Sequence, residues 1–145
     1  MLVPASLGIM ETLLPVAGTS LIACQGLKVL LAISKYKFSC QRLLQPGGMP
    51  SSHTAVVTSL ATTLGLIYGL TSPFFQISAV FGGIVIYDAI TLRRAVSEHA
   101  CRINMIYRQE GIRDCDELLE NLGHTPLEVL VGLLIGLLTA LIFFY

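Results

Sequence analysis

The chain has 145 residues, no formal net charge and only 12% charged residues, against 54% hydrophobic ones. Soluble globular domains carry about 25% charged residues, so this composition argues against an ordinary soluble domain. The charges are clustered, which leaves long uncharged stretches. We therefore expect a lipid bilayer around the protein and no nucleic acid among its partners.

Four apolar segments approach the roughly 20 residues that a helix needs to cross a bilayer. They are residues 13–34, 54–71, 73–92 and 126–145. Buried helices of a soluble bundle would need charged outer faces, which these segments lack. The sequence predicts an all-α fold, a polytopic transmembrane bundle of about four spanning helices, in a single domain over residues 1–145.

The region before the first span carries no signal for export. No Lys or Arg precedes Lys28, so the basic start of a signal peptide is missing and we expect no cleaved presequence. The cysteines show neither CxxC nor zinc spacing, and we expect free thiols at Cys24, Cys40, Cys101 and Cys115.

The basic residues predict the orientation in the membrane. Apart from Lys28, they all lie in the connections after the first and third spans: Lys35, Lys37, Arg42, Arg93, Arg94, Arg102, Arg108 and Arg113. The positive-inside rule places these two connections in the cytoplasm and both termini outside. The predicted location is the cell membrane, with the starts of the second and fourth spans facing the cytoplasm.

The second span opens with Gly47-Gly48-Met49-Pro50-Ser51-Ser52-His53-Thr54. The free N–H groups and dipole of a helix's first turn attract anions such as phosphate. A serine cap, worth about 1 kcal/mol, is the alternative explanation, but it accounts for one serine only.

The fourth span has a second histidine at its start. Thr125-x-x-Glu128 has capping-box spacing, with Pro126 at the favoured first position of the helix. Glu128 could instead bond the imidazole of His124, which would set its tautomer and activate the other ring nitrogen. The sequence leaves both roles of Glu128 open.

Ionisable residues within spans are costly and usually functional. Lys28 could bind substrate or extend to the inner interface. Asp88 could pair with Lys28 or with Arg93 and Arg94, and either arginine could bind phosphate or only anchor the topology. His99, beside Ser97 and Glu98, is interpreted as structural, and no residues have metal-ligand spacing.

Three further expectations concern packing and connections. Gly65-x-x-x-Gly69 and Gly132-x-x-x-Gly136 fit close helix packing in lipid, and the sequence leaves a homo-oligomer open. The third span is expected to continue past Arg94 as an amphipathic segment. Residues 110–123 are expected to form a loop with a short helix.

The chain resembles the divergent branch of the type 2 phosphatidic acid phosphatase family, which is related to vanadium-dependent haloperoxidases. The resemblance extends from about Cys24 to the end, and rests on four segments: Gln25-x-x-Lys28, Gly47-Gly48-Met49-Pro50-Ser51-Ser52-His53, Tyr87-Asp88-Ala89 with Arg93-Arg94-Ala95, and Gly123-His124-Thr125-Pro126-x-Glu128-Val129.

This resemblance implies a phosphatase that uses neither metal nor cofactor and works through a phosphohistidine. His124 would be the nucleophile, oriented by Glu128 in place of the usual Asp, and His53 would protonate the leaving group. The phosphate would be held by backbone N–H groups and by Ser51, with Ser52, Lys28, Arg93 and Arg94 as the other candidate residues around the substrate. Asp88 would organise the cations at this site.

The chain departs from the family pattern at several positions. Leu118 stands where the third motif has Arg, and Ser52 replaces a Gly. Ser97-Glu98-His99 replaces the branch's Gly-x-Gln. Lys35 and Arg42 reproduce the first-motif spacing of the wider family, whereas the divergent branch points to Lys28, which we favour.

Three hypotheses follow. The leading one is a lipid phosphatase that hydrolyses a phosphomonoester on phosphatidylglycerophosphate, phosphatidic acid or a polyprenyl phosphate at the cytoplasmic face. The second, motivated by Leu118, is a catalytically silent phospholipid-binding or lipid-translocating protein. The third, vanadate-dependent halide oxidation, fits poorly because those enzymes are large soluble helical proteins.

Overall fold

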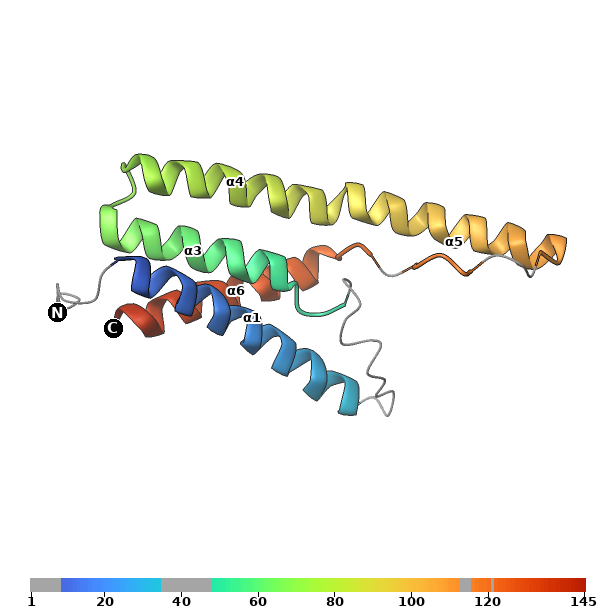
Figure 1. The fold of residues 1–145 in the computed structure, drawn as a ribbon, viewed down its shortest axis with the longest axis horizontal. Helices are drawn as coiled ribbons and strands as arrows, with labels where there is room; N and C mark the ends of the chain where they lie inside the picture. The colour runs from blue at the N-terminus through green and yellow to red at the C-terminus, as the bar shows by residue number, and fades with distance from the viewer. Residues whose placement is uncertain (1–8, 35–47, 113–115, 121) are drawn as a thin grey trace.

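The computed structural model describes residues 9–34, 48–112, 116–120 and 122–145, and every regular element in these ranges is an α-helix (Figure 1). The helices are α1 (Ile9–Ser34), α3 (Ser52–Tyr68), α4 (Pro73–Ile90), α5 (Leu92–Glu110) and α6 (Pro126–Phe144). The prediction of an all-α polytopic bundle is confirmed.

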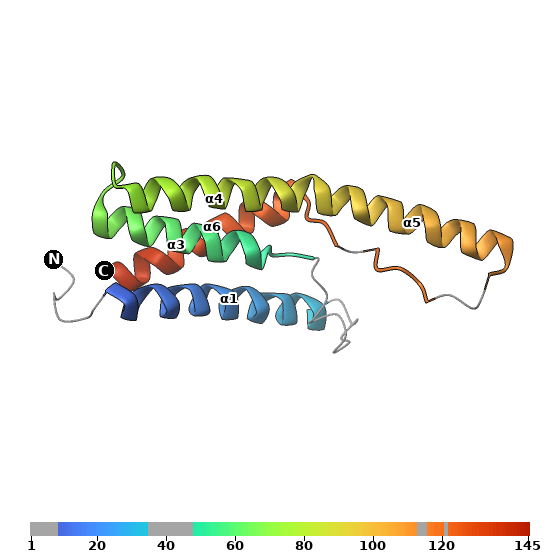
Figure 2. The same ribbon diagram turned by 45° about the horizontal axis from the view of Figure 1, so that its top comes forward.

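Helix α3 runs opposite to α1, the continuous helix of α4 and α5 runs opposite to α3, and α6 runs back in the direction of α3 (Figures 1 and 2). The C-terminal end of α1 and the N-terminal ends of α3 and α6 lie at one end, and the C-terminus lies at the other (Figures 1 and 2). The starts of the second and fourth predicted spans therefore open at the same end of the molecule.

Among the described residues, three helices are long and apolar enough to cross a membrane: Thr12–Leu31, Pro73–Glu110 and Pro126–Phe144. The other predicted span forms α3, whose 17 residues stand at the lower limit of about 17–25 for a spanning helix. Helix α3 ends at Gly69, which has a φ of 86°. Gly69 is thus a helix cap, and because a Cβ there would meet nothing within 4 Å, the expected close packing was wrong for Gly69. It is confirmed for Gly65, where a Cβ would stand 3.0 Å from the Phe75 ring of α4.

The distribution of side chains fits a lipid environment. The buried apolar residues are mostly small, as in Ala55, Ala89 and Ala140, whereas Phe81 is 62% and Ile142 75% exposed. Small residues between helices and large apolar residues outside are typical of membrane bundles, because lipid solvates large side chains as well as a protein core does.

The packing of α6 on α3 depends on glycine. A Cβ at Gly132 would collide with the carbonyl oxygen of Ser51, and a Cβ at Gly136 with that of Ala55. The backbone N–H of Ser51 also donates to the carbonyl of Glu128 (3.1 Å). The predicted close packing at Gly132-x-x-x-Gly136 is confirmed, and it brings the starts of α3 and α6 side by side.

Helix α4 continues into α5 through Thr91, and α5 extends beyond the end of the other helices (Figure 2). The expected continuation past Arg94 is confirmed and runs to Glu110. The expected short helix in residues 110–123 is absent from the described part of that stretch beyond α5. Here the backbone bonds to α5 side chains instead of to itself.

Candidate active site

His124 is held at the junction of two helices. It directly precedes the cap of α6, and its backbone N–H donates to the carbonyl of Ala89 near the end of α4 (3.1 Å). The preceding residue, Gly123, lies so close to α5 that a Cβ there would stand 2.5 Å from the Cα of Arg94. The His124 side chain is only 1% exposed.

Glu128 performs both roles that the sequence left open. Its Oε2 lies 3.2 Å from Nδ1 of His124 and also accepts the backbone N–H of Thr125 (3.0 Å). The Thr125 hydroxyl accepts the Glu128 N–H in return (3.4 Å), which completes a capping box. The cap therefore holds the carboxylate in the position from which it bonds the imidazole.

The second ring nitrogen of His124 carries no hydrogen bond from the described residues. A carboxylate beside Nδ1 favours the tautomer with the proton on Nδ1, which leaves the lone pair on Nε2. That Nε2 is buried and has no hydrogen-bond partner among the described residues. Burial lowers the pKa of His124, the bond to Glu128 opposes this, and the charges of Lys28 and Arg93 lower the pKa further.

His53, the second residue of α3, is exposed, and the charges of Lys28 and Arg93 act on it as they do on His124. The charges that act on its imidazole come from four residues: Arg93, His124, Lys28 and Asp88. Glu128 acts on Lys28 as well as on His124. Residues from α1, α3, α4, α5 and the start of α6 thus converge at one end of the bundle.

The arginine pair divides between two environments. Nε of Arg93 donates to Oδ2 of Asp88 (2.8 Å), which decides between the two partners that the sequence allowed for Asp88. Arg94 pairs instead with Glu98 (3.4 Å), and both of these side chains are more than half exposed. Of the two arginines, Arg93 is the one whose charge acts on both imidazoles.

The two serines also differ. The hydroxyl oxygen of Ser51 accepts from the hydroxyl (2.9 Å) and the backbone N–H (3.4 Å) of Thr54, so it caps α3, and its side chain is fully buried. Ser52 is 8% exposed and begins the helix. The N–H groups of Ser52 and His53 have no acceptor within the helix, as expected for its first turn.

Two residues of interest were not singled out by sequence reasoning. Gln25 precedes Lys28 by one helical turn, and its Oε1 is buried without a partner among the described residues. The family segment Gln25-x-x-Lys28 contains this glutamine, but sequence reasoning gave Gln25 no role. Asn104, a buried amide in an otherwise polar and charged helix, has side-chain bonds to the segment that leads to His124.

The remaining sequence candidates lie outside the cluster or outside the described residues. His99 is exposed on α5, and Cys24 and Cys101 are free thiols. Lys35, Arg42, Cys40 and Cys115 fall outside the described residues. Within the ranges described, no group of three or more His, Cys, Asp or Glu side chains is arranged to hold a metal ion.

Leu118, at the position of the missing motif arginine, lies beside the later part of α5, away from the start of that helix. Its backbone bonds to Asn104, which follows Arg93 by eleven positions in the same helix, a rise of about 16 Å. A cation at this position would stand well away from the imidazoles. Arg93 is much better placed to supply that charge.

Comparison with known proteins agrees with this architecture. The family described as the Divergent PAP2 family matches residues 9–139. An uncharacterized membrane protein of Bacillus subtilis (strain 168), YuiD, is 36% identical over 141 residues, with 87% of this chain and 89% of the relative covered. No solved structure matches the chain. The resemblance inferred from the motifs is confirmed: this membrane protein belongs to the divergent PAP2 family.

Proposed function

We propose that the protein is an integral-membrane lipid phosphatase that hydrolyses a phosphomonoester through a phosphohistidine on His124. One observation carries the proposal: a buried, unpartnered Nε2 whose lone pair is set by Glu128 and which lies within the influence of Lys28 and Arg93. A neutral imidazole among fixed positive charges suits attack on a phosphate monoester, because the cations offset the charge on the phosphoryl oxygens.

The reaction proceeds in two displacements. The Nε2 lone pair of His124 attacks phosphorus, the bond from phosphorus to the lipid oxygen breaks, and His53 donates a proton to that oxygen. Water then attacks the phosphohistidine while His53 takes the water proton. The P–N bond breaks, its electrons return to Nε2, and inorganic phosphate leaves.

The remaining groups bind the phosphoryl oxygens. Lys28 and Arg93 supply positive charge, and Asp88 holds the Arg93 guanidinium in place. The first-turn N–H groups of Ser52 and His53, with the positive end of the α3 dipole, supply hydrogen bonds. Ser51 supports this arrangement as the cap of α3 rather than as a direct ligand.

The substrate is a lipid presented at the cytoplasmic leaflet. Arg94 lies against Gly123, just before α6, and the sequence carries basic residues in both of the connections that precede α3 and α6. The positive-inside rule therefore favours a cytoplasmic site. A phosphomonoester lipid made on that side, of the phosphatidylglycerophosphate type, is favoured over polyprenyl phosphates that are processed on the far side.

The test is phosphate release from a panel of lipid phosphates by detergent-purified protein. The variants are His124→Ala and His53→Ala, with His99→Ala as a matched control, because His99 is exposed on α5 away from the cluster. We expect the parent and the control to release phosphate, and His124→Ala to release none. Acid-labile phosphate trapped on residue 124 would identify the nucleophile.

A second candidate function is phospholipid binding without turnover. It is favoured by the burial of Nε2, which a phosphate reaches only after the site opens. Binding of phosphatidic acid vesicles that persists in His124→Ala, with no phosphate release by the parent, would support it against the phosphatase.

A further inference from the structure

The segment that leads to His124 lies along α5, and we call residues 116–120 and 122–125 the return segment. Asn104 on α5, which is 1% exposed, holds it at two points. Its Oδ1 accepts the backbone N–H of Leu118 (2.9 Å), and its Nδ2 donates to the Leu118 carbonyl (2.8 Å). This pairing imitates a neighbouring β-strand, so it sets both the position and the orientation of the peptide.

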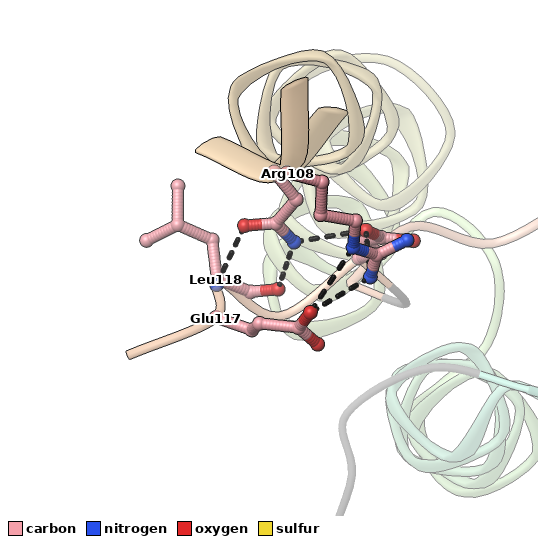
Figure 3. Close-up of polar contacts among 5 residues, drawn as sticks. Arg108, Glu117 and Leu118 are labelled. Carbon is pink, nitrogen blue, oxygen red and sulfur yellow. Dashed lines mark hydrogen bonds and ion pairs between the residues drawn. The ribbon is translucent and has the colours of Figure 1, made fainter. Parts of the chain in front are cut away.

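Further bonds join the same segment to α5. Nδ2 of Asn104 also donates to Oε1 of Glu120 (2.8 Å), and the Ser97 hydroxyl donates to the Glu120 carbonyl. Arg108 pairs with Glu117 (2.9 Å) beside Leu118, as Figure 3 shows. At the far end the His124 N–H bonds the Ala89 carbonyl.

The segment between these attachments is short compared with the separation of its anchors along the helix. Asn104 and Ala89 are fifteen positions apart in a continuous helix, a rise of about 22 Å. The chain from Leu118 to His124 spans six residues, which reach at most about 20–22 Å when fully extended. The described residues of the return segment accordingly form no helix between the two anchors.

From this we infer that Asn104 is a positioning residue for His124. By anchoring the outer end of this short segment to α5, it prevents the His124 backbone from shifting relative to Ala89 and the imidazole from leaving its buried position. Gly123 reinforces the constraint, because the chain there passes directly against Arg94. The catalytic part of this inference rests on the proposed function of His124, but the placement itself does not.

The chemistry at position 104 requires an amide. The two Nδ2 protons go to the Leu118 carbonyl and to the Glu120 carboxylate, and Oδ1 accepts from the Leu118 N–H. Asn104→Asp would keep the acceptor but would set two carboxylates against each other. Adding Glu120→Gln would restore that hydrogen bond with donor and acceptor exchanged.

The experiment measures how fast diethyl pyrocarbonate modifies His124 in the full-length protein, by mass spectrometry, with exposed His99 as internal reference. This reagent reacts with neutral imidazole. We expect Asn104→Asp and Asn104→Ala each to accelerate modification of His124 by about tenfold or more, because the anchor bonds are lost. Asn104→Asp/Glu120→Gln should recover part of the protection, because it restores the bond to residue 120 but not the bond to the Leu118 carbonyl. Gln109→Ala, an exposed change on α5, should leave the protection intact.

Protection of His124 that is unchanged in both single variants would overturn the inference. If Asn104→Asp fails to fold, the inference is tested with Asn104→Ala and with amide hydrogen exchange in the parent. Exchange of the Leu118 and His124 amides at unrelated rates would also overturn the inference. In activity assays, kcat should fall about tenfold or more with KM little changed, because the nucleophile is misplaced while the phosphate-binding cations remain. If His124 is modified faster in the Asn104 variants but the parent releases no phosphate, the phosphatase proposal is rejected and the anchoring role of Asn104 is retained.

Discussion

Nδ1 of His124 lies 3.2 Å from Oε2 of Glu128, one helical turn further along the chain, and that same oxygen accepts the Thr125 backbone N–H. The helix cap and the orientation of the imidazole therefore depend on one carboxylate. A side chain bound from two directions loses little freedom when the site acts, because its geometry is set before substrate arrives.

The first prediction separates these two roles. Glu128→Gln keeps an oxygen that can cap Thr125 but removes the charge that favours a proton on Nδ1 and stabilises the imidazolium. We expect kcat to fall about 100-fold, within the range of acid–base effects, with little change in the melting temperature. The measurement is steady-state phosphate release with thermal unfolding, and Glu98→Gln on α5 is the control. An equal loss of stability and activity would show that Glu128 acts only as a cap.

The second prediction concerns the close approach of α3 and α6. Gly132→Ala and Gly136→Ala each place a methyl group against a backbone carbonyl of α3, and such overpacking costs about 1–3 kcal/mol. Equilibrium unfolding in mixed micelles should show this destabilisation. Gly83→Ala in α4, where a Cβ meets nothing within 4 Å, should be neutral or stabilising. Equal effects at Gly83 and Gly132 would contradict the packing.

The third prediction concerns pH. Burial lowers the pKa of His124 from its ordinary value of 6.5, so the imidazole stays neutral below the pH at which an exposed histidine becomes protonated. The rate of its modification by diethyl pyrocarbonate should therefore decline with a midpoint below 6.5, whereas His99 serves as the exposed comparison. Between pH 6.5 and the lowered pKa of His124, the unfolded chain binds the proton whereas the folded chain does not. The free energy of unfolding should therefore fall as pH falls through this range. A midpoint for His124 at or above 6.5 would contradict the burial argument.

The fourth prediction distinguishes the two arginines. Arg93 acts on both imidazoles and is held by Asp88, whereas Arg94 pairs with Glu98 at the surface. Arg93→Ala should lower kcat/KM by about 100-fold, as expected when a group that binds transition-state charge is lost. Arg94→Ala should cost much less, and Arg102→Ala, exposed further along α5, is the control. The outcome that would reverse the assignment is a larger loss at Arg94 than at Arg93.

Sequence alone determined the apolar segments, the capping-box spacing at Thr125, the shared end of both histidines and the family, because these depend on composition, local spacing and short motifs. It could not show that Ser51 is the buried cap of α3, that Gly69 ends α3, or that residues 116–120 form no helix. Each of these depends on which backbone or side-chain groups stand opposite.

Tertiary structure decided which groups meet across the bundle. It paired Asp88 with Arg93, placed both the cap and the imidazole bond on one oxygen of Glu128, and anchored Leu118 to Asn104. These contacts join residues whose separation in sequence carries no helical or strand period. They arise only when α3, α6 and the long helix of α4 and α5 pack together, because close packing then leaves each side chain a single set of partners.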